Sequence, residues 1–223
     1  MENTVHFTLQ GKGGIGKSFI TSLLCEYIQN SADRIEAFDT DQINTTLSQY
    51  DAFQAKPISI KDDDHLINPK KFDSLIVDMV NTQAPVIVDT GANSFTALVN
   101  YIISNQIFEL LLENKKRIYI HTIIAGGDMR DDTANGFNAL LDVISVPTVL
   151  WINEHFGSTK TDSGRPISES KLVQKHMDNL IGAVWLNKLH SQTFGEDVNK
   201  MAHHRLTTAQ AIASPLFNIV EKQ

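Results

Sequence analysis

The chain has 223 residues, a formal net charge of −7 and 42% hydrophobic residues, which suffices for one well-buried domain over residues 1–223. The acidic balance excludes attachment to nucleic acid by bulk charge, and the single cysteine, Cys25, excludes an internal disulfide and a cluster of cysteine ligands. With no signal-peptide pattern at the start and no run of about 18 apolar residues, we expect a cytoplasmic protein.

Short apolar runs alternate with helical patterns along the chain. The first run, Val5–Leu9, leads into a glycine-rich loop, and a helix is predicted from Lys17 with one apolar face made of Ile20, Leu23, Leu24, Tyr27 and Ile28. A second helix is expected to begin at Pro69. Further strands are predicted at residues 34–41, 85–93, 117–128, 146–154 and 182–188.

Near-continuous apolar strands separated by helices predict an α/β fold, in which a mainly parallel twisted sheet carries helices on both faces. Trp151 and Trp185 lie within apolar strands and are expected in the core. Asp128, Asp131 and Asp132 are expected to begin a helix and to favour its positive end.

Distinctive polar residues follow the predicted strands. The stretches GKGGIGKS (11–18), DTDQIN (39–44), TGAN (90–93) and NEHFG (153–157) each come directly after an apolar run. Ligands of parallel α/β sheets bind at the carboxyl ends of the strands, so we expect these stretches to form one site.

The first stretch fits the phosphate-loop pattern G-x-x-x-x-G-K-[ST] between a strand and a helix. Its backbone N–H groups would surround a phosphate, Lys17 would reach the β- and γ-phosphates, and the Ser18 hydroxyl would bind Mg²⁺. The alternative is a glycine-rich turn without a ligand. The residues expected to contact the nucleotide here are Gly11, Lys12, Gly13, Gly14, Ile15, Gly16, Lys17, Ser18 and Phe19.

Three carboxylates are candidates for the metal and the attacking water. Asp89 ends an apolar strand and suits a carboxylate that holds Mg²⁺ through water, although an Asp that caps the following turn is the alternative. Asp39 and Asp41 flank Thr40, and alternate residues of an extended chain share a face. We assign Asp39 to the water shell of the metal and Asp41 to the attacking water, while helix capping is the alternative for either.

Two asparagines at strand ends are candidates for reading the base. A guanine reader of the N-K-x-D type needs a final carboxylate, and neither Asn153–Glu–His–Phe nor Asn187–Lys–Leu–His supplies one. An asparagine amide can instead pair with the adenine edge, which favours ATP. Asn153 is the better candidate, and a strand-end turn former is the alternative for both.

These motifs resemble the ParA/MinD family of P-loop ATPases. KGGIGKS is similar to the family's deviant Walker A motif, DTD to its second acidic motif and VIVDTGA to its Walker B strand, and the resemblance continues in order over most of the chain. Within the family, the QGKGG opening and the WIN stretch are similar to the TraL (StbC-like) ATPases of conjugative plasmids.

The resemblance implies a role for the early lysine, Lys12, which in this family reaches the nucleotide of a second subunit in an ATP-sandwich dimer. It implies a slowly hydrolysing, Mg²⁺-dependent ATPase that acts as a switch in plasmid transfer or in DNA partition or positioning, with a protein partner that the sequence does not identify. It also implies the water-positioning role of Asp41. A solvated loop lysine is the alternative for Lys12.

Two other classes of function remain open: a small metabolic P-loop enzyme, such as a kinase or a carboxylate ligase, and a nucleotide-dependent binding module that does not hydrolyse ATP. The residues His203–His204, with Lys200 and Arg205, could form a basic face for DNA or a partner, and a solvated helix surface is the alternative. Residues 213–223 lack a basic amphipathic face, so no membrane binding is expected.

Overall fold

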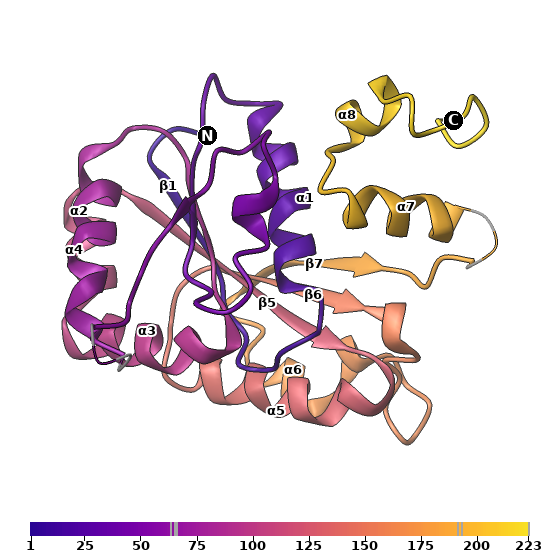
Figure 1. Cartoon of the computed structure of the whole chain (residues 1–223). Coiled ribbons are helices and arrows are strands. Elements are labelled where there is room, and N and C mark those ends of the chain that lie inside the picture. Colours follow the sequence, from indigo (N-terminus) through magenta and orange to yellow (C-terminus); the bar gives the residue numbers. More distant parts are fainter. Residues whose placement is uncertain (63, 65–66, 191, 193, 223) are drawn as a thin grey trace.

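The computed structural model of the chain describes residues 1–62, 64, 67–190, 192 and 194–222. These residues form a seven-stranded sheet in which all neighbouring strands are parallel (Figure 1). In spatial order the strands are β3 (Lys56–Pro57), β2 (Glu36–Asp39), β4 (Val86–Asp89), β1 (Thr4–Thr8), β5 (Arg117–Ala125), β6 (Thr148–Asn153) and β7 (Leu180–Leu186). The predicted parallel α/β sheet is therefore confirmed.

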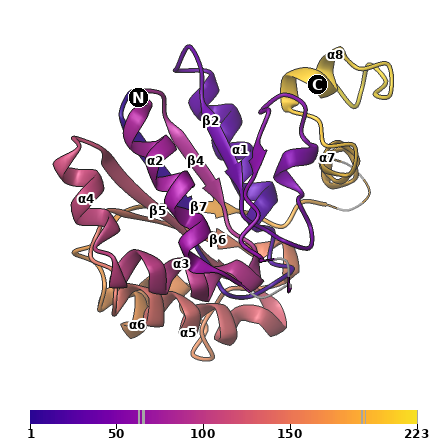
Figure 2. The ribbon, with the colours of Figure 1, turned by 60° about the vertical axis from the view of Figure 1, so that its left-hand side comes forward.

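Helices cover both faces of this sheet, as predicted (Figures 1 and 2). One face carries α2 to α6, and the other carries α1, with α7 and α8 standing beyond it on the β7 side. The helices are α1 (Lys17–Gln29), α2 (Asp73–Asn81), α3 (Ala92–Ser104), α4 (Ile107–Glu113), α5 (Arg130–Leu141), α6 (Lys171–Gln174), α7 (Phe194–His203) and α8 (Thr208–Ala213).

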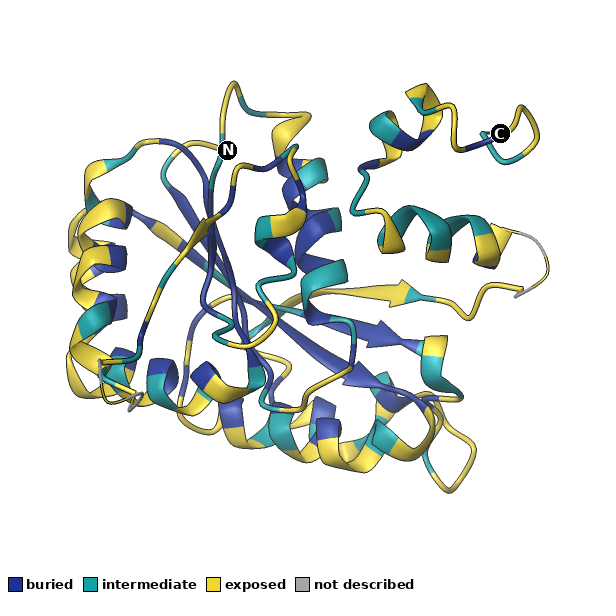
Figure 3. Ribbon diagram, viewed as in Figure 1, coloured by how far each residue is buried: buried dark blue, intermediate teal, exposed yellow. Residues whose placement is uncertain are grey.

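The central strands form the core. Every residue of β1 and β4 is buried (Figure 3). Phe7 of β1 and Val88 of β4 pack in the layer beneath α2, α3 and α4, whereas Ile87 packs beneath α1 on the opposite face. This double coverage explains why the central strands read as almost continuous apolar runs.

The predicted helix starts are close to the observed ones. Pro69 begins a 3₁₀ turn, Pro69–Phe72, which Asn68 caps and which leads into α2. Asp131 and Asp132 lie in the first turn of α5, where carboxylates favour the positive end of a helix.

The prediction that Tyr27 belongs to the buried face of α1 is wrong. Ile20 and Ile28 are at most 1% exposed, but Tyr27 is 63% exposed and Leu23 is only half-buried. Leu23 and Tyr27 are four residues apart and lie on the flank of α1 that the sheet does not cover.

The two tryptophans differ in exposure to solvent. Trp151 on β6 is 7% exposed, which confirms its place in the core, whereas Trp185 on β7 is 48% exposed, so the core prediction for it is wrong. Among the described strands, β7 pairs only with β6, and all of its residues are exposed or half-buried (Figure 3). An apolar run at a sheet edge gives the same sequence pattern as one in the centre.

A row of polar side chains crosses the buried sheet from β6 to β1. The Trp151 indole N–H donates to His121 Nδ1 (3.1 Å), which places the proton of His121 on Nε2, and Nε2 then donates to His6 Nδ1 (3.0 Å). Burial lowers the pKa of His6 to about 4 and that of His121 to about 3. Both rings are therefore neutral at pH 7.

Among the described residues, no single helix has the length and apolarity needed to cross a membrane. The pair α3 and α4 meets these criteria only when taken together, and the two helices are bent by 61° at their junction. Residues of both, including Leu98, Ile102 and Leu111, pack in the core beside the sheet.

Candidate functional site

The phosphate loop, residues 11–18, turns sharply from β1 into α1. Gly14 and Gly16 adopt φ angles of 73° and 88°, which residues with a side chain rarely adopt, and Gly16 directly precedes the first residue of α1. Lys17 is 8% exposed, and its Nζ donates to the Lys12 carbonyl oxygen (2.6 Å). Burial lowers the pKa of Lys17, while the carboxylates of Asp89 and Asp41 oppose this shift.

Asp89, at the carboxyl end of β4, has one oxygen without a partner. Its Oδ1 accepts a hydrogen bond from Thr21 Oγ1 (2.8 Å), whereas its buried Oδ2 has no hydrogen-bond partner among the residues that the structure describes. Burial raises its pKa, against the effect of the Ser18 and Thr21 hydroxyls and of Lys17. Because a buried acceptor ordinarily has a partner, this orphaned oxygen next to the phosphate loop fits a hydrated Mg²⁺ ion.

The carboxylates of Asp39 and Asp41 accept hydrogen bonds from backbone N–H groups. Asp39 is fully buried and accepts from the N–H groups of Asp41 (3.0 Å) and Ser48 (3.1 Å), one with each oxygen. Burial and the nearby Asp89 carboxylate raise its pKa to about 6. These bonds hold the loop after β2 in shape, and a metal role for Asp39 would have to act alongside them.

Asp41 lies at the edge of the site. Its Oδ1 accepts from the N–H groups of Ile43 (2.9 Å) and Asn44 (3.1 Å), and its side chain lines the cavity described below. These bonds stabilise a turn rather than a helix start, because no helix begins at Gln42. Gly91 permits this position, because a Cβ at residue 91 would lie 2.6 Å from Asp41 Cγ. The water-positioning role of Asp41 therefore stays a prediction.

The two asparagines have different surroundings. Asn153 is 4% exposed, its Nδ2 donates to the Ile15 carbonyl oxygen (3.0 Å) and its Oδ1 accepts from His155 N–H (3.1 Å). The amide of Asn153 thus already holds the phosphate loop, which leaves less of it for a base. Asn187 is exposed at the end of β7 and lines the cavity. This contrast makes Asn187 the freer of the two candidates.

Lys12 points away from the loop that carries it. Its Nζ forms an ion pair with Asp132 Oδ2 (2.6 Å) in the first turn of α5, and the two side chains are 42% and 62% exposed. Within one copy of the chain, the Lys12 side chain is thus paired with Asp132 at the start of α5 and does not point toward Lys17.

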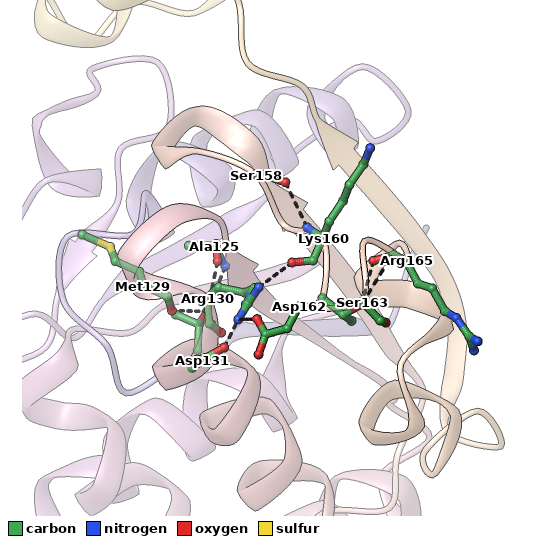
Figure 4. Close-up of polar contacts among 11 residues, drawn as sticks. Ala125, Met129, Arg130, Asp131, Ser158, Lys160, Asp162, Ser163 and Arg165 are labelled. Atoms are coloured by element: carbon green, nitrogen blue, oxygen red, sulfur yellow. Dashed lines mark hydrogen bonds and ion pairs between the residues drawn. The ribbon is translucent and has the colours of Figure 1, made fainter.

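The start of α5 is also fixed from its other side (Figure 4). The Arg130 guanidinium lies between Asp131 (2.8 Å) and Asp162 (2.6 Å) and donates to the Lys160 carbonyl oxygen (2.6 Å). Arg130 therefore ties the surface loop after β6 to α5. No pattern in the sequence pointed to this contact.

A cavity of about 1240 Å³ extends from the phosphate loop to the C-terminal helices. The loop, Lys17, Asp41 and Asn153 line one end of it. His155 and Phe156 also line it, and they lie in the stretch 153–157 that was expected at the site. The rest of the lining includes residues of β7, of the segment after it and of α7, which were not predicted there: Trp185, Leu189, Phe194 and Val198. Of these, Leu189 follows a strand end, the position at which ligands bind in such sheets.

No established family profile matches the chain. Two curated proteins of Escherichia coli, each called Protein TraL, are 32% and 31% identical to it over 221 residues, covering 98% of this chain and 91% of each relative.

Several solved structures share the fold. A plasmid partition protein from Borrelia burgdorferi has a TM-score of 0.50 at 12% identity, covering 92% of this chain and 96% of its own. The MinC:MinD cell division complex of Aquifex aeolicus has a TM-score of 0.53 at 12% identity, with coverages of 96% and 90%. A nucleotide-binding protein in complex with ADP from Archaeoglobus fulgidus has a TM-score of 0.51 at 13% identity, with coverages of 99% and 94%. At such identities the likeness is one of fold.

Proposed function

The chain belongs to the TraL family, and from this premise we propose that it is an ATP-driven molecular switch that hydrolyses ATP slowly in the presence of Mg²⁺. In this proposal it works in the cytoplasm, in plasmid conjugative transfer or in DNA partition or positioning. It acts through a protein partner that is still to be identified, and contact with DNA is a further part of the proposal. The MinC:MinD complex, as a neighbour in fold, supports the expectation of a partner.

The observation that carries the proposal is the orphaned Oδ2 of Asp89 beside the phosphate loop. A buried carboxylate with a raised pKa is costly in an empty site, and a divalent cation would stabilise its charged form. Lys17, held nearby on the Lys12 carbonyl, supplies the cation that phosphate oxygens need. Mg²⁺ in such sites neutralises charge on the transferring phosphoryl group.

The chain's own residues divide the remaining work. The N–H groups of the phosphate loop and the N-terminus of α1 would bind the phosphates, and the Ser18 hydroxyl and Asp89 would hold the metal and its water. The Asp41 carboxylate would orient the attacking water. Asn187, with Trp185 and Phe156 nearby in the cavity lining, would contact the adenine.

The dimeric form of the switch depends on Lys12. An exposed ion pair such as Lys12–Asp132 contributes only about 0–1 kcal/mol, so Lys12 can exchange Asp132 for the phosphates of a second subunit at little cost. A second cation there would stabilise negative charge that develops during phosphoryl transfer. Without ATP, two facing lysines would repel each other, which makes dimerisation depend on the nucleotide.

The test is the mass of the protein in solution with ADP, ATP and a slowly hydrolysed ATP analogue, together with phosphate release. We expect a monomer with ADP and a dimer with ATP or the analogue. Lys17→Ala should abolish ATP binding, whereas Lys12→Ala should bind ATP as a monomer and release no phosphate. A Lys12→Ala protein that still dimerises with ATP would contradict the role of Lys12. Transfer of phosphate to a small acceptor would favour the metabolic enzyme instead.

A further inference from the structure

The side chain of Gln10, the last residue before the phosphate loop, is hydrogen-bonded on both sides of its amide. Gln10 is 2% exposed, and its Nε2 donates to the carbonyl oxygens of Ile123 (2.9 Å) and Thr133 (3.0 Å). Its Oε1 accepts from the Gly11 N–H (2.8 Å). One amide thus joins the end of β5, the first turn of α5 and the first residue of the loop.

Helix α5 makes room for this amide. Gly136 lies in the interior of α5, where glycine is unfavourable, and a Cβ at this position would lie 2.4 Å from Gln10 Oε1. Glutamine side chains ordinarily move aside easily, but this one is buried and held by three hydrogen bonds. The contact with Gln10 therefore explains why a glycine occupies the middle of α5.

The loop and α5 are joined at two points, which together close a ring. The buried point is Gln10 to Thr133, and the exposed point is the ion pair of Lys12 with Asp132, the residue next to Thr133. Thr133 is itself fixed to the end of β5, because its Oγ1 accepts from the Ala125 N–H (3.0 Å). The exposed attachment can break when Lys12 moves, and the buried one then remains.

We propose that Gln10 is a positioning residue that keeps the phosphate loop in register with α5, so that Lys12 can leave Asp132 without the loop losing its shape. The movement of Lys12 rests on the function proposed above, while the attachment of the loop to α5 does not. Gln10 fixes the backbone of Gly11 and thereby that of Lys12. Because the Lys12 carbonyl oxygen accepts a hydrogen bond from Lys17 Nζ, Gln10 also helps to position this ammonium group, which would bind phosphate.

The first test needs no nucleotide. A glycine-to-alanine change inside a helix ordinarily raises the Tm of a protein of this size by about 2–4 °C. We expect the opposite sign for Gly136→Ala, with faster hydrogen exchange in peptides covering residues 9–15. A Gly136→Ala protein with a raised Tm and unchanged exchange in these peptides would overturn the proposal.

The second test separates hydrogen bonding from the filling of space. Gln10→Met keeps the length of the side chain and removes its hydrogen bonds, so it should exchange as fast as Gln10→Ala in peptides 9–15. If methionine restores the slow exchange of the wild type, Gln10 serves only to fill space and the proposal is wrong.

The third test is a double-mutant cycle read as the Kd for ATP. Asp132→Ala alone should change the Kd less than threefold, since the buried attachment remains, and Gln10→Ala alone should raise it severalfold. Together they should raise the Kd by at least threefold more than the product of the two single effects, because both attachments are lost. A purely multiplicative result would overturn the proposal. If the wild type binds no ATP, the proposed function fails, and the first two tests still decide the role of Gln10.

Discussion

Replacement of Asn153 by alanine should destabilise the protein, because this amide is part of the phosphate loop's support. The change removes the donor to the Ile15 carbonyl and the acceptor of the His155 N–H, both in a residue that is 4% exposed. A buried polar group that loses its partner costs about 1–3 kcal/mol, so we expect a loss of about 2 kcal/mol in the free energy of unfolding. In a chain of this length the corresponding fall in Tm is about 4–8 °C.

The assay is urea unfolding without nucleotide, followed by ATP titration. Asn187→Ala is the matched control: this residue is exposed and lines the same cavity, so its stability should change by less than about 0.5 kcal/mol while its ATP affinity falls. Asn153→Asp adds a sharper test, because a carboxylate oxygen would face the Ile15 carbonyl. It should be at least as unstable as Asn153→Ala. An Asn153→Ala protein with wild-type stability and weakened ATP binding would show that Asn153 contacts the base rather than supporting the loop.

Three further predictions follow from the same site and core. Asp89→Asn should weaken the binding of Mg²⁺-ATP more than that of metal-free ATP in calorimetric titrations, because the orphaned Oδ2 loses its charge; equal losses would place the metal elsewhere. Asp41→Ala should bind ATP normally, release phosphate about 10²–10⁴-fold more slowly and accumulate as a dimer, whereas a protein that stays monomeric with ATP would argue against this role. Acidification should lower the free energy of unfolding through His6, because the pKa of His6 falls to about 4 on folding. Below about pH 6.5 the His6 side chain takes up a proton in the unfolded chain but not in the folded protein. Between pH 7 and pH 5 this loss is about 2 kcal/mol, and a His6→Gln variant should lose correspondingly less in urea unfolding. Asp39, with a folded pKa of about 6, acts in the opposite direction in both proteins, and equal pH dependence in the two would show that His6 is protonated while folded.

The placement of the phosphate loop and of Asp89 at strand ends was predictable because each lies in a short, contiguous sequence pattern. The loop at Gly11–Ser18 and the strand end at Asp89 follow from short patterns whose geometry is local. Tyr27 and Trp185 were misplaced because periodicity identifies an apolar face without saying whether another element covers it.

Contacts between distant parts of the chain could not be predicted from the sequence. The Lys12–Asp132 pair joins residues 120 positions apart, and the Asn153–Ile15 bond joins residues 138 positions apart. A single asparagine at a strand end looks alike whether it supports a loop or faces a ligand. Only the packing of β6 against the phosphate loop distinguishes the two.

The two ends of the cavity rest on strands of unequal rigidity. The phosphate loop follows β1, every residue of which is buried, whereas Trp185 and Asn187 lie in and just after β7, whose residues are all exposed or half-buried. Local opening of a native protein is rare in buried central strands and frequent at exposed edges. In the function proposed above, the end of the site that would contact the base opens more often than the phosphate loop. A change in β7 would then alter the rate of nucleotide exchange, and with it the lifetime of each nucleotide state, without altering the residues on the central strands that would carry out hydrolysis.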